Sequence, residues 1–367
     1  MGGSVFYPLT ISHVTPETDS AVRVGFVIPE ALSDQFKFRS GQYLTLRTSI
    51  DGELVSRSYS ICVPAESDSL EVAVKRVDGG VFSNFANDRL VAGAELEVMP
   101  PQGNFCIDPS PGAKADYLFI AAGSGITPMM ALMQSVLLNE RGSTVTLIYG
   151  NQRTATIMFR QKLAFMKNQY MERFQWINVL SREEQEAPVL NGRIDNKKGA
   201  QLQNGIIDIR RFEKFMLCGP ESMISEVSRG LTELGIDDSS ISYELFGSSA
   251  EDAQARVAKH HARSQTHARL LAQVTMISDG RSNTVAVAAA GENLLDAGLN
   301  LGLDLPYACK GGVCATCKAL LVEGEVEMDI QRGLTEEEVR NGMILTCQAH
   351  PLSDNVVVDF DKRWAGH

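Results

Sequence analysis

Residues 309–317 read CKGGVCATC, three cysteines in nine positions wrapped around a pair of glycines. A fourth cysteine stands in LTCQA, separated from the third by 29 residues. A Cys-x4-Cys-x2-Cys run with a distant fourth thiol is one of the known ligand spacings of [2Fe–2S] clusters. Gly311 and Gly312 permit the positive φ angles and close backbone approach that a tight loop around a cluster requires. The predicted ligands are Cys309, Cys314, Cys317 and Cys347.

These thiols have other conceivable roles. Disulfides are disfavoured because nothing in the sequence indicates export from a reducing compartment. Structural zinc usually takes two CxxC arms, or one CxxC arm with histidines. Here only Cys314 and Cys317 have that spacing, and His350 is the sole histidine nearby. A reactive nucleophile would not need four thiols, so structural zinc remains the main alternative to the cluster.

The bulk composition narrows the class of protein. With 367 residues, 44% of them apolar and 22% charged, the chain has room for two or three globular domains. Its net charge of −11, without a prominent Lys and Arg cluster, argues against nucleic acid as a partner. No apolar run approaches the roughly 20 residues that span a bilayer. The first residues, MGGSVFYPLTISHV, lack the features of a secretory signal, so we expect a cytoplasmic protein.

The pattern of apolar and polar residues changes along the chain. Up to about residue 110, short alternating runs such as VRVGFVIP and SLEVAVKRV predict an antiparallel barrel. From residue 111 to residue 247, apolar strands such as YLFIAAG, TVTLIYGN and KFMLCGP alternate with helical segments, which predicts a parallel sheet covered by helices on both faces. Strands return from residue 272 and enclose the cysteine loop.

Residues 248–271 separate the last two parts. They are rich in Ala, Ser, Gln and charge and lack an apolar stripe, which predicts a solvated linker with some helix. His260, His261 and His267 lie in this segment. No thiol or carboxylate cluster completes a metal site around them, so we interpret them as solvated side chains.

The cluster loop with its flank, YACKGGVCATCKALLVEGEVEM, resembles that of chloroplast-type ferredoxins. The resemblance implies a β-grasp fold for residues 272–367 and transfer of single electrons. This segment holds seven Lys and Arg against fourteen Asp and Glu, a net charge of −7. We therefore hypothesise that it docks on a basic patch of its electron acceptor and that docking is sensitive to salt.

A second motif, RSYS at residues 57–60, matches the RxYS signature of the ferredoxin–NADP reductase superfamily. The resemblance implies a flavin. Tyr59 can stack on the isoalloxazine ring, Arg57 can bind the pyrophosphate, and Ser60 can hydrogen-bond the redox-active edge of the ring. Two further segments, AVKRV and GGVFSN, follow in the order of this family, the second as a glycine-led turn that can grip phosphate. The expected FAD-binding residues are Arg57, Ser58, Tyr59, Ser60, Val74, Lys75, Gly80, Val81, Phe82, Ser83 and Phe246.

A third motif, IAAGSGITPMM at residues 120–130, reads as a strand, a Gly-x-Gly turn and the start of a helix. Such a turn lets backbone approach a cofactor, and the helix N-terminus favours anionic groups. The CGP tripeptide ends another strand of the same predicted sheet, whose ligands bind at the carboxyl ends of the strands. The expected nicotinamide-nucleotide residues in these two motifs are Gly123, Gly125, Thr127, Pro128, Cys218, Gly219 and Pro220.

Three further residues are candidates for binding a 2′-phosphate: Ser181, Arg182 and Arg193. They favour NADPH, with NADH as the alternative. Relatives place the CGP cysteine near the nicotinamide and a C-terminal aromatic over the flavin. The resemblance therefore implies a hydride-transfer site of Ser60, Cys218 and Phe246, and we expect no side chain to be required as a general acid or base.

The order of the parts resembles the reductase components of multicomponent oxygenases. It implies an FAD-binding barrel (1–110), an NAD(P)-binding α/β domain (111–247), a linker (248–271) and a [2Fe–2S] ferredoxin domain (272–367). Electrons would pass from NADPH through FAD and the cluster to an oxygenase component with a di-iron centre. The alternatives are a reductase for a Rieske-type dioxygenase or an acyl desaturase, and, more remotely, a metal-binding redox sensor.

Overall fold

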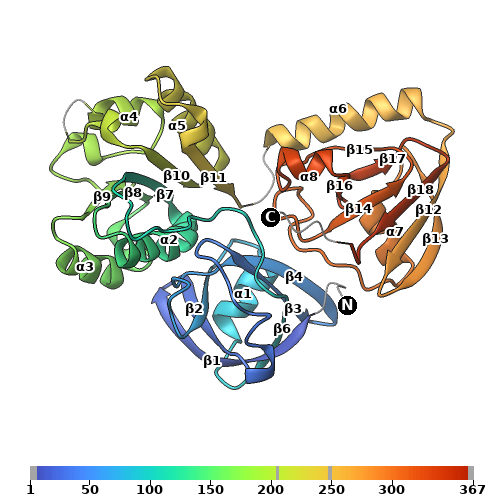
Figure 1. The fold of residues 1–367 in the computed structure, drawn as a ribbon, viewed down its shortest axis with the longest axis horizontal. Coiled ribbons are helices and arrows are strands. Elements are labelled where there is room, and N and C mark those ends of the chain that lie inside the picture. Colours follow the sequence, from blue (N-terminus) through green and yellow to red (C-terminus); the bar gives the residue numbers. More distant parts are fainter. Residues whose placement is uncertain (1–5, 204–205, 247–249, 363–367) are drawn as a thin grey trace. The chain divides into compact units, whose positions relative to one another are not determined.

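The structure is a computed structural model that describes residues 6–203, 206–246 and 250–362 (Figure 1). The chain divides into two compact units. One contains most of the residues from Pro8 to Leu245, and the other contains the residues from Phe246 onward.

The first part of the larger unit is a six-stranded sheet in the order β4-β3-β6-β1-β2-β5. Strand β2 pairs antiparallel with both β1 and β5. A bridge between Ile61 and Val72 and a 2.9 Å hydrogen bond from Cys62 N–H to the Glu71 carbonyl join the end of β4 to β5 and close the sheet. The predicted antiparallel barrel is therefore confirmed. Its elements are β1(Tyr7–Thr18), β2(Ala21–Val27), β3(Tyr43–Ile50), β4(Glu53–Ser60), β5(Leu70–Lys75), α1(Val81–Asp88) and β6(Glu95–Val98).

The second part of the larger unit is a five-stranded parallel sheet in the order β11-β10-β7-β8-β9. The middle portions of its central strands are apolar and buried because helices cover both faces, as the sequence predicts. The elements are β7(Asp116–Ala122), α2(Ile126–Asn139), β8(Thr144–Asn151), α3(Arg160–Gln169), β9(Phe174–Leu180), α4(Asn196–Gln203), β10(Lys214–Gly219), α5(Glu221–Glu233) and β11(Ile241–Leu245).

Two apolar cores lie on the two faces of this parallel sheet. Helices α2 and α3 pack on one face, and the core there also takes in barrel side chains such as Phe105 and Ala73. Helices α4 and α5 pack on the other face. The barrel and the α2 face of the sheet thus share one core, which fixes the barrel against the strands that carry the Gly-x-Gly turn and Cys218.

Helix α2 starts at that turn and is anchored at its other end by Arg173. The guanidinium donates at 2.9 Å to the Leu137 carbonyl and at 2.9 Å to the Glu140 carbonyl. These are carbonyls that a helix C-terminus leaves without partners. A cation at this end also interacts favourably with the partial negative charge of the helix dipole.

The smaller unit contains a five-stranded sheet in the order β13-β12-β18-β14-β16 and a two-stranded sheet of β15 and β17. Strands β12 and β18 run parallel, whereas β12 with β13, β14 with β16 and β18, and β15 with β17 are antiparallel pairs. The elements are α6(Ala250–Thr266), β12(Leu271–Ser278), β13(Arg281–Ala288), α7(Leu294–Asn300), β14(Lys318–Glu323), β15(Val326–Met328), α8(Glu336–Arg340), β16(Met343–Leu345), β17(Ala349–Pro351) and β18(Asn355–Asp359).

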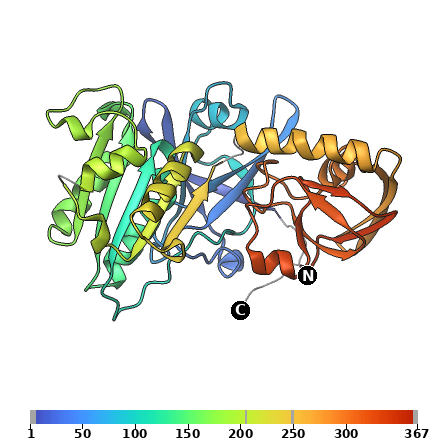
Figure 2. The ribbon, with the colours of Figure 1, turned by 90° about the horizontal axis from the view of Figure 1, so that it is seen from above.

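The segment expected to be a solvated linker contains the helix α6, which lies alongside the C-terminal domain in both ribbon views (Figures 1 and 2). His260 and His261 are exposed, as expected for solvated side chains. Arg263, however, is buried, and Lys259 donates to the carbonyls of Met328 and Asp329. The expectation of a solvated segment therefore fails for one face of α6, where basic rather than apolar side chains make the contacts.

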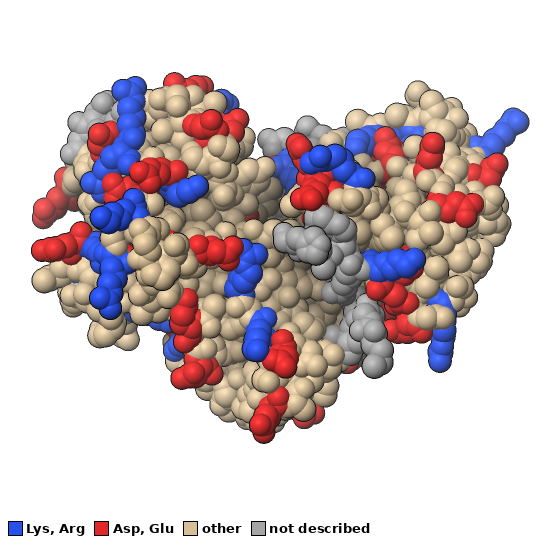
Figure 3. Space-filling view, in the orientation of Figure 1, with Lys and Arg blue, Asp and Glu red and all other residues tan. Residues whose placement is uncertain are grey.

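Charged side chains of both signs are interspersed on the face shown in Figure 3, and among the coloured residues no extended basic patch gathers there. Within the described ranges, none of the helices combines the length and the apolar character needed to cross a bilayer.

Replacement of Arg173 by Met is expected to lower the free energy of unfolding by roughly 1–3 kcal/mol, because it removes the donor to the buried end of α2. Urea-induced unfolding followed by tryptophan fluorescence measures the change. The exposed Arg210 provides the matched control, Arg210→Met. Equal unfolding midpoints for the two variants would contradict the anchoring role.

Candidate functional site

The cysteine loop presents its thiols to converging hydrogen-bond donors. The N–H of Gly311 donates to Cys309 Sγ at 3.2 Å. A hydrogen bond from the Cys314 thiol lowers the pKa of Cys309 to about 5, against the opposing effect of burial. Backbone N–H groups of the same loop act in the same direction: Gly311, Val313 and Cys314. The loop therefore stabilises a thiolate, the form in which cysteine binds metal.

The four predicted ligands come together as two pairs. Cys309 is hydrogen-bonded to Cys314, and Cys317 is hydrogen-bonded to Cys347. A [2Fe–2S] cluster has two irons and four thiolate ligands, so each iron takes two thiols, and the observed pairing fits this donor set. Structural zinc needs four donors around one point. In the described part of the chain, no group of three or more His, Cys, Asp or Glu side chains is arranged to hold a single ion.

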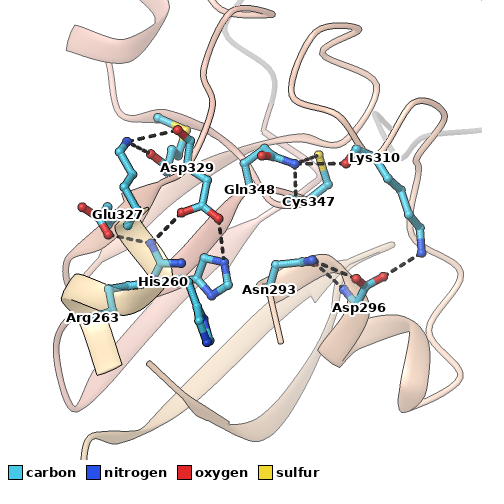
Figure 4. A network of polar contacts seen from close by, with 12 residues as sticks. His260, Arg263, Asn293, Asp296, Lys310, Glu327, Asp329, Cys347 and Gln348 are labelled. Atoms are coloured by element: carbon cyan, nitrogen blue, oxygen red, sulfur yellow. Dashed lines mark hydrogen bonds and ion pairs between the residues drawn. The ribbon is translucent and has the colours of Figure 1, made fainter. Parts of the chain in front are cut away.

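The fourth thiol is held against the loop by its sequence neighbours. Thr346 donates from its hydroxyl to the Cys317 carbonyl at 2.9 Å. Gln348 Nε2 donates to the Lys310 carbonyl at 3.0 Å, as Figure 4 shows. Gly312 has a φ of +78°, and a Cβ there would lie 2.9 Å from both Ile330 and Gln348, so only glycine fits.

Lys310 follows the first ligand and is fixed on both sides. Its backbone is left-handed, with a φ of 49°, and its ammonium lies 2.6 Å from Asp296 Oδ1. The same ammonium sits 4.7 Å from the centroid of the Tyr307 ring. Asp296 belongs to the first turn of α7, which Asn293 caps, so the cysteine loop is tied to a helix of its own domain (Figure 4).

The RSYS motif lies at the end of β4. Tyr59 packs against Phe82 with ring centroids 5.5 Å apart, so two of the predicted flavin residues meet. Arg57 is exposed, with Nη1 donating to the Ser56 carbonyl at 2.7 Å. Val74 is fully buried in β5, which limits it to shaping the site from within the barrel.

The GGVFSN segment is the start of a helix rather than only a turn. Gly80 is the N-cap of α1, and Val81 and Phe82 belong to its first turn. The Ser83 hydroxyl accepts from the Val77 N–H at 3.0 Å and donates to the Gly80 carbonyl at 3.4 Å. Its hydroxyl is therefore engaged locally, while the first-turn N–H groups remain the natural donors to an anion.

The Gly-x-Gly turn lies against the CGP strand. Gly123 has a φ of +56°, and a Cβ on Gly125 would lie 2.2 Å from the Cys218 carbonyl oxygen. Gly125 is thus required by the packing of β10 on the turn, independently of any cofactor. Thr127 is buried and donates its hydroxyl to the Ser124 carbonyl at 3.0 Å. Pro128 is likewise buried in α2.

Lys75 brings the barrel to the same turn. A Cβ built on Gly123 would lie 3.6 Å from Lys75 Nζ, so the ammonium borders the turn. Burial lowers the pKa of Lys75 below its usual value. A half-buried cation between the predicted flavin and nucleotide sites suits an anionic or carbonyl group of either ligand.

Glu244 is a site residue that the sequence did not predict. It lies in β11 opposite Cys218 of β10 in the parallel register, and Ser60 Oγ donates to its Oε2 at 3.4 Å. Burial raises the pKa of Glu244 to about 8, opposed by the Ser60 hydrogen bond. Three strands therefore bring a hydroxyl, a thiol and a carboxyl together. Burial also raises the pKa of Cys218 well above its usual value, so this thiol stays protonated.

The remaining predicted nucleotide residues lie at the carboxyl ends of strands. The N–H of Ser181 donates to the Asn151 carbonyl at 3.0 Å, which joins the segment after β9 to the end of β8. Arg182 and Arg193 are exposed. Gly219 and Pro220 link β10 to α5, with Pro220 as its N-cap. Phe246 directly follows β11 and is 47% exposed.

Three family models match the chain in the predicted order. One described as an oxidoreductase FAD-binding domain matches residues 9–107. One described as an oxidoreductase NAD-binding domain matches residues 119–229. One described as a 2Fe-2S iron-sulfur cluster binding domain matches residues 277–352. The expected FAD, nicotinamide-nucleotide and [2Fe–2S] cofactors are confirmed at the level of domains, and the chain is an oxidoreductase.

Relatives match nearly the whole chain. It is 41% identical over 360 residues to a 1,2-phenylacetyl-CoA epoxidase subunit of Escherichia coli (strain K12), covering 98% of this chain and 99% of the relative. It is 32% identical to the ferredoxin reductase component of 3-ketosteroid-9-alpha-monooxygenase from Rhodococcus rhodochrous, covering 98% of both chains. It is 31% identical to a glycine betaine monooxygenase reductase subunit of Pseudomonas aeruginosa (strain UCBPP-PA14), covering 89% of this chain and 88% of the relative.

Solved structures support the fold. Phthalate dioxygenase reductase, whose structure is described as modular, is 20% identical and matches with a TM-score of 0.55 over 96% of this chain and 98% of that chain. An intact type IV self-sufficient cytochrome P450 monooxygenase is 21% identical and matches with a TM-score of 0.68 over 96% of this chain and 41% of that chain. The predicted fold class, with its three kinds of domain, is confirmed.

Replacement of Glu244 by Gln is expected to make stability less dependent on pH. The folded carboxyl keeps its proton to about pH 8, whereas the unfolded one ionises near its ordinary pKa of 4.5, so wild-type stability falls as pH rises between these values. Glutamine does not ionise, so the stability of the variant would not fall with rising pH for this reason. The variant should match wild type near pH 5 and exceed it by roughly 1–3 kcal/mol at pH 8.

Thermal unfolding of the FAD-loaded protein across this pH range measures the difference, with the exposed Glu172→Gln as the matched control. A stability difference between Glu244→Gln and wild type that is constant from pH 5 to pH 8 would show that Glu244 titrates normally.

Proposed function

Because this chain belongs to the family of oxygenase reductase components that includes the 1,2-phenylacetyl-CoA epoxidase relative, we propose that it delivers electrons to the di-iron oxygenase of a phenylacetyl-CoA epoxidase. The electrons would come from NADPH and pass through FAD and the [2Fe–2S] cluster. The observation that carries the proposal is the identity of 41% across nearly the whole of both chains. The segments PYACKGGVCATCK, TLIYGNQ and GRID add to it, since they resemble the reductase of that epoxidase.

Each cofactor supplies chemistry that side chains lack: FAD takes up an electron pair as hydride and releases it singly, and the cluster carries one electron at a time. The chain's part is to hold and orient these groups. Cys309 and Cys314 would bind one iron, and Cys317 and Cys347 the other. The N–H groups around Cys309 favour its thiolate form before any metal is bound.

The barrel would hold FAD between β4 and α1. Tyr59 is the proposed platform for the ring, and Arg57 with the first-turn N–H groups of α1 would bind the pyrophosphate. The exposure of Arg57 and the position of Gly80 at the N-cap support this assignment. Ser58 lies between Arg57 and Tyr59 on the same strand and is assigned to the same site.

The hydride-transfer site would lie where Ser60, Cys218 and Glu244 meet. Ser60 can donate a hydrogen bond to the flavin edge, and Glu244 holds a proton near neutral pH that it can exchange with Ser60 or with water. The neutral Cys218 thiol would offer the nicotinamide a small, weakly polar contact surface. We assign Phe246 to cover the flavin until the nicotinamide displaces it, on the family resemblance alone.

A cytoplasmic location is part of the proposal. All seven cysteines are free thiols in the structure, and four of them must remain reduced to take up iron. The proposal includes no nucleic-acid partner, on the ground of the net charge of −11.

A different oxygenase partner is the second candidate. The identity of 32% to a 3-ketosteroid monooxygenase reductase component over 98% of the chain keeps this candidate open. It predicts the same cofactors and electron path, and differs only in the protein that receives the electrons.

Reconstitution separates these candidates. The purified protein should show flavin and cluster absorbance that NADPH bleaches, and it should support NADPH-dependent epoxidation of phenylacetyl-CoA when mixed with the oxygenase subunits of that epoxidase. The Cys347→Ser variant should reduce ferricyanide through the flavin but fail to support epoxidation. Bleaching by NADPH with no epoxidation, and turnover with another oxygenase instead, would favour the second candidate.

Replacement of Arg182 by Ala is expected to raise the KM for NADPH about tenfold or more while leaving the KM for NADH unchanged, since a guanidinium–phosphate contact contributes on the order of 1.5–3 kcal/mol. Steady-state ferricyanide reduction with each nucleotide measures both values. Arg210→Ala, in an exposed position, is the control. An equal change in KM for both nucleotides would remove Arg182 from the proposed 2′-phosphate site.

A further inference from the structure

Helix α6 carries a row of basic side chains where an amphipathic helix would carry apolar ones. Arg256, Lys259 and Arg263 are spaced by three and four residues, which places them on one helix face. The Arg263 side chain is only 3% exposed. His260 and His261 lie between Lys259 and Arg263 in the sequence but on other parts of the helix surface, and both are exposed. The basic face is therefore the face that α6 turns toward its own domain.

The side chains of Lys259 and Arg263 form hydrogen bonds and ion pairs with three consecutive residues. Arg263 Nη1 lies 2.6 Å from Glu327 Oε2 and 2.6 Å from Asp329 Oδ1. Lys259 Nζ donates to the Met328 carbonyl at 2.6 Å and to the Asp329 carbonyl at 3.1 Å. Two cations of one helix thus bind the end of β15. Arg263 contacts its side chains and Lys259 contacts its backbone (Figure 4).

The segment that Lys259 and Arg263 contact pairs with the strand that follows the fourth thiol. Strand β15 pairs with β17, which begins two residues after Cys347, and Glu327 stands opposite His350. The Asp329 N–H donates to the Gln348 carbonyl at 2.9 Å, and His350 Nε2 lies 3.4 Å from Asp329 Oδ2. Asp329 therefore contacts both the backbone of Gln348, next to Cys347, and the side chain of His350.

Burial makes the contact with Arg263 costly to lose. The Asp329 side chain is 9% exposed, and the Glu327 side chain is 33% exposed. Without the guanidinium, the largely buried Asp329 carboxylate would lie beside the Glu327 carboxylate. The cationic or potentially cationic groups left near it would be the imidazole of His350 and the ammonium of Lys259, which bonds to the Asp329 carbonyl. A buried charge that loses its partner is strongly unfavourable, and the segment would shift to hydrate it.

We propose that Arg263 of α6 is a positioning residue for Cys347, acting through Asp329 and the backbone of Gln348. Helix α6 is then a structural part of the cluster domain rather than a linker. The inference rests on the cluster-binding role of Cys347 in the proposed function.

The test compares full-length Arg263→Met with Arg263→Lys and with Arg269→Met, a cation that is exposed beyond the end of α6. Cluster loading is followed by iron and labile sulfide content, by the EPR spectrum of the reduced cluster and by its reduction potential. Arg263→Met should shift the g values and the potential and release iron to a chelator about tenfold faster or more. Arg263→Lys should recover part of each change, and Arg269→Met should equal wild type. Ferricyanide reduction through the flavin should be the same in all variants.

Wild-type EPR, potential and iron release in Arg263→Met would overturn the proposal. If Arg263→Met is not recovered as folded protein, Asp329→Asn and Glu327→Gln decide, because only the first removes the carboxylate that leads to Cys347. Altered cluster signals in Asp329→Asn with unchanged signals in Glu327→Gln support the proposal, and equal signals in the two overturn it. Wild-type protein that takes up no iron and sulfide would instead contradict the proposed function itself.

Discussion

The structure of the cluster domain depends on keeping two separate stretches of chain face to face. Three thiols come from the loop that follows α7 and the fourth comes from the segment between β16 and β17. Thr346 bonds to the Cys317 carbonyl on one side of Cys347, and Gln348 bonds to the Lys310 carbonyl on the other. Because a cluster tolerates little change in the positions of its thiolates, these two hydrogen bonds from side chains to backbone carbonyls help to keep the ligand set together.

The proposed electron-entry site of the larger unit likewise depends on elements that are distant in sequence. Ser60, Cys218 and Glu244 come from three strands and two sheets, and a shared apolar core holds those sheets together. Gly125 contributes by having no side chain, since the Cys218 carbonyl occupies the place of its Cβ. In both units, rigid strands position the polar groups, and the glycines mark where backbone must come close.

Local signals carried most of what the sequence could predict. The spacing of the thiols, the alternation of the barrel strands and the apolar strand before Gly123 are contained within short windows, and the structure agrees with each. Glu244 lay outside such windows. Its importance follows from the parallel register that sets it opposite Cys218, and a one-dimensional pattern does not contain that register. A carboxyl in the last strand of the parallel sheet, directly after Tyr243, was the available hint in the sequence.

The packed face of helix α6 escaped prediction for a different reason. The periodicity that indicates a packed helix face is apolar, whereas α6 contacts its domain through Lys259 and Arg263. The Ala-rich composition that predicted a solvated linker also favours helix, and the partners of the basic face, Glu327 and Asp329, lie more than sixty residues away. Helix α1 was likewise hidden, because GGVFSN contains both a turn signal and a helix N-terminus.

The strand order of the cluster domain has a consequence for how the protein is made. Strand β18 lies in the middle of the sheet between β12 and β14, although it follows both of them in the sequence. Until β18 has been synthesised, the pair β12 and β13 and the pair β14 and β16 have no strand between them, so the sheet is split in two. Strand β14 begins directly after Cys317, and β16 ends two residues before Cys347. A chain without β18 is therefore expected to keep its flavin and nucleotide domains but to lose the sheet that supports these two thiols.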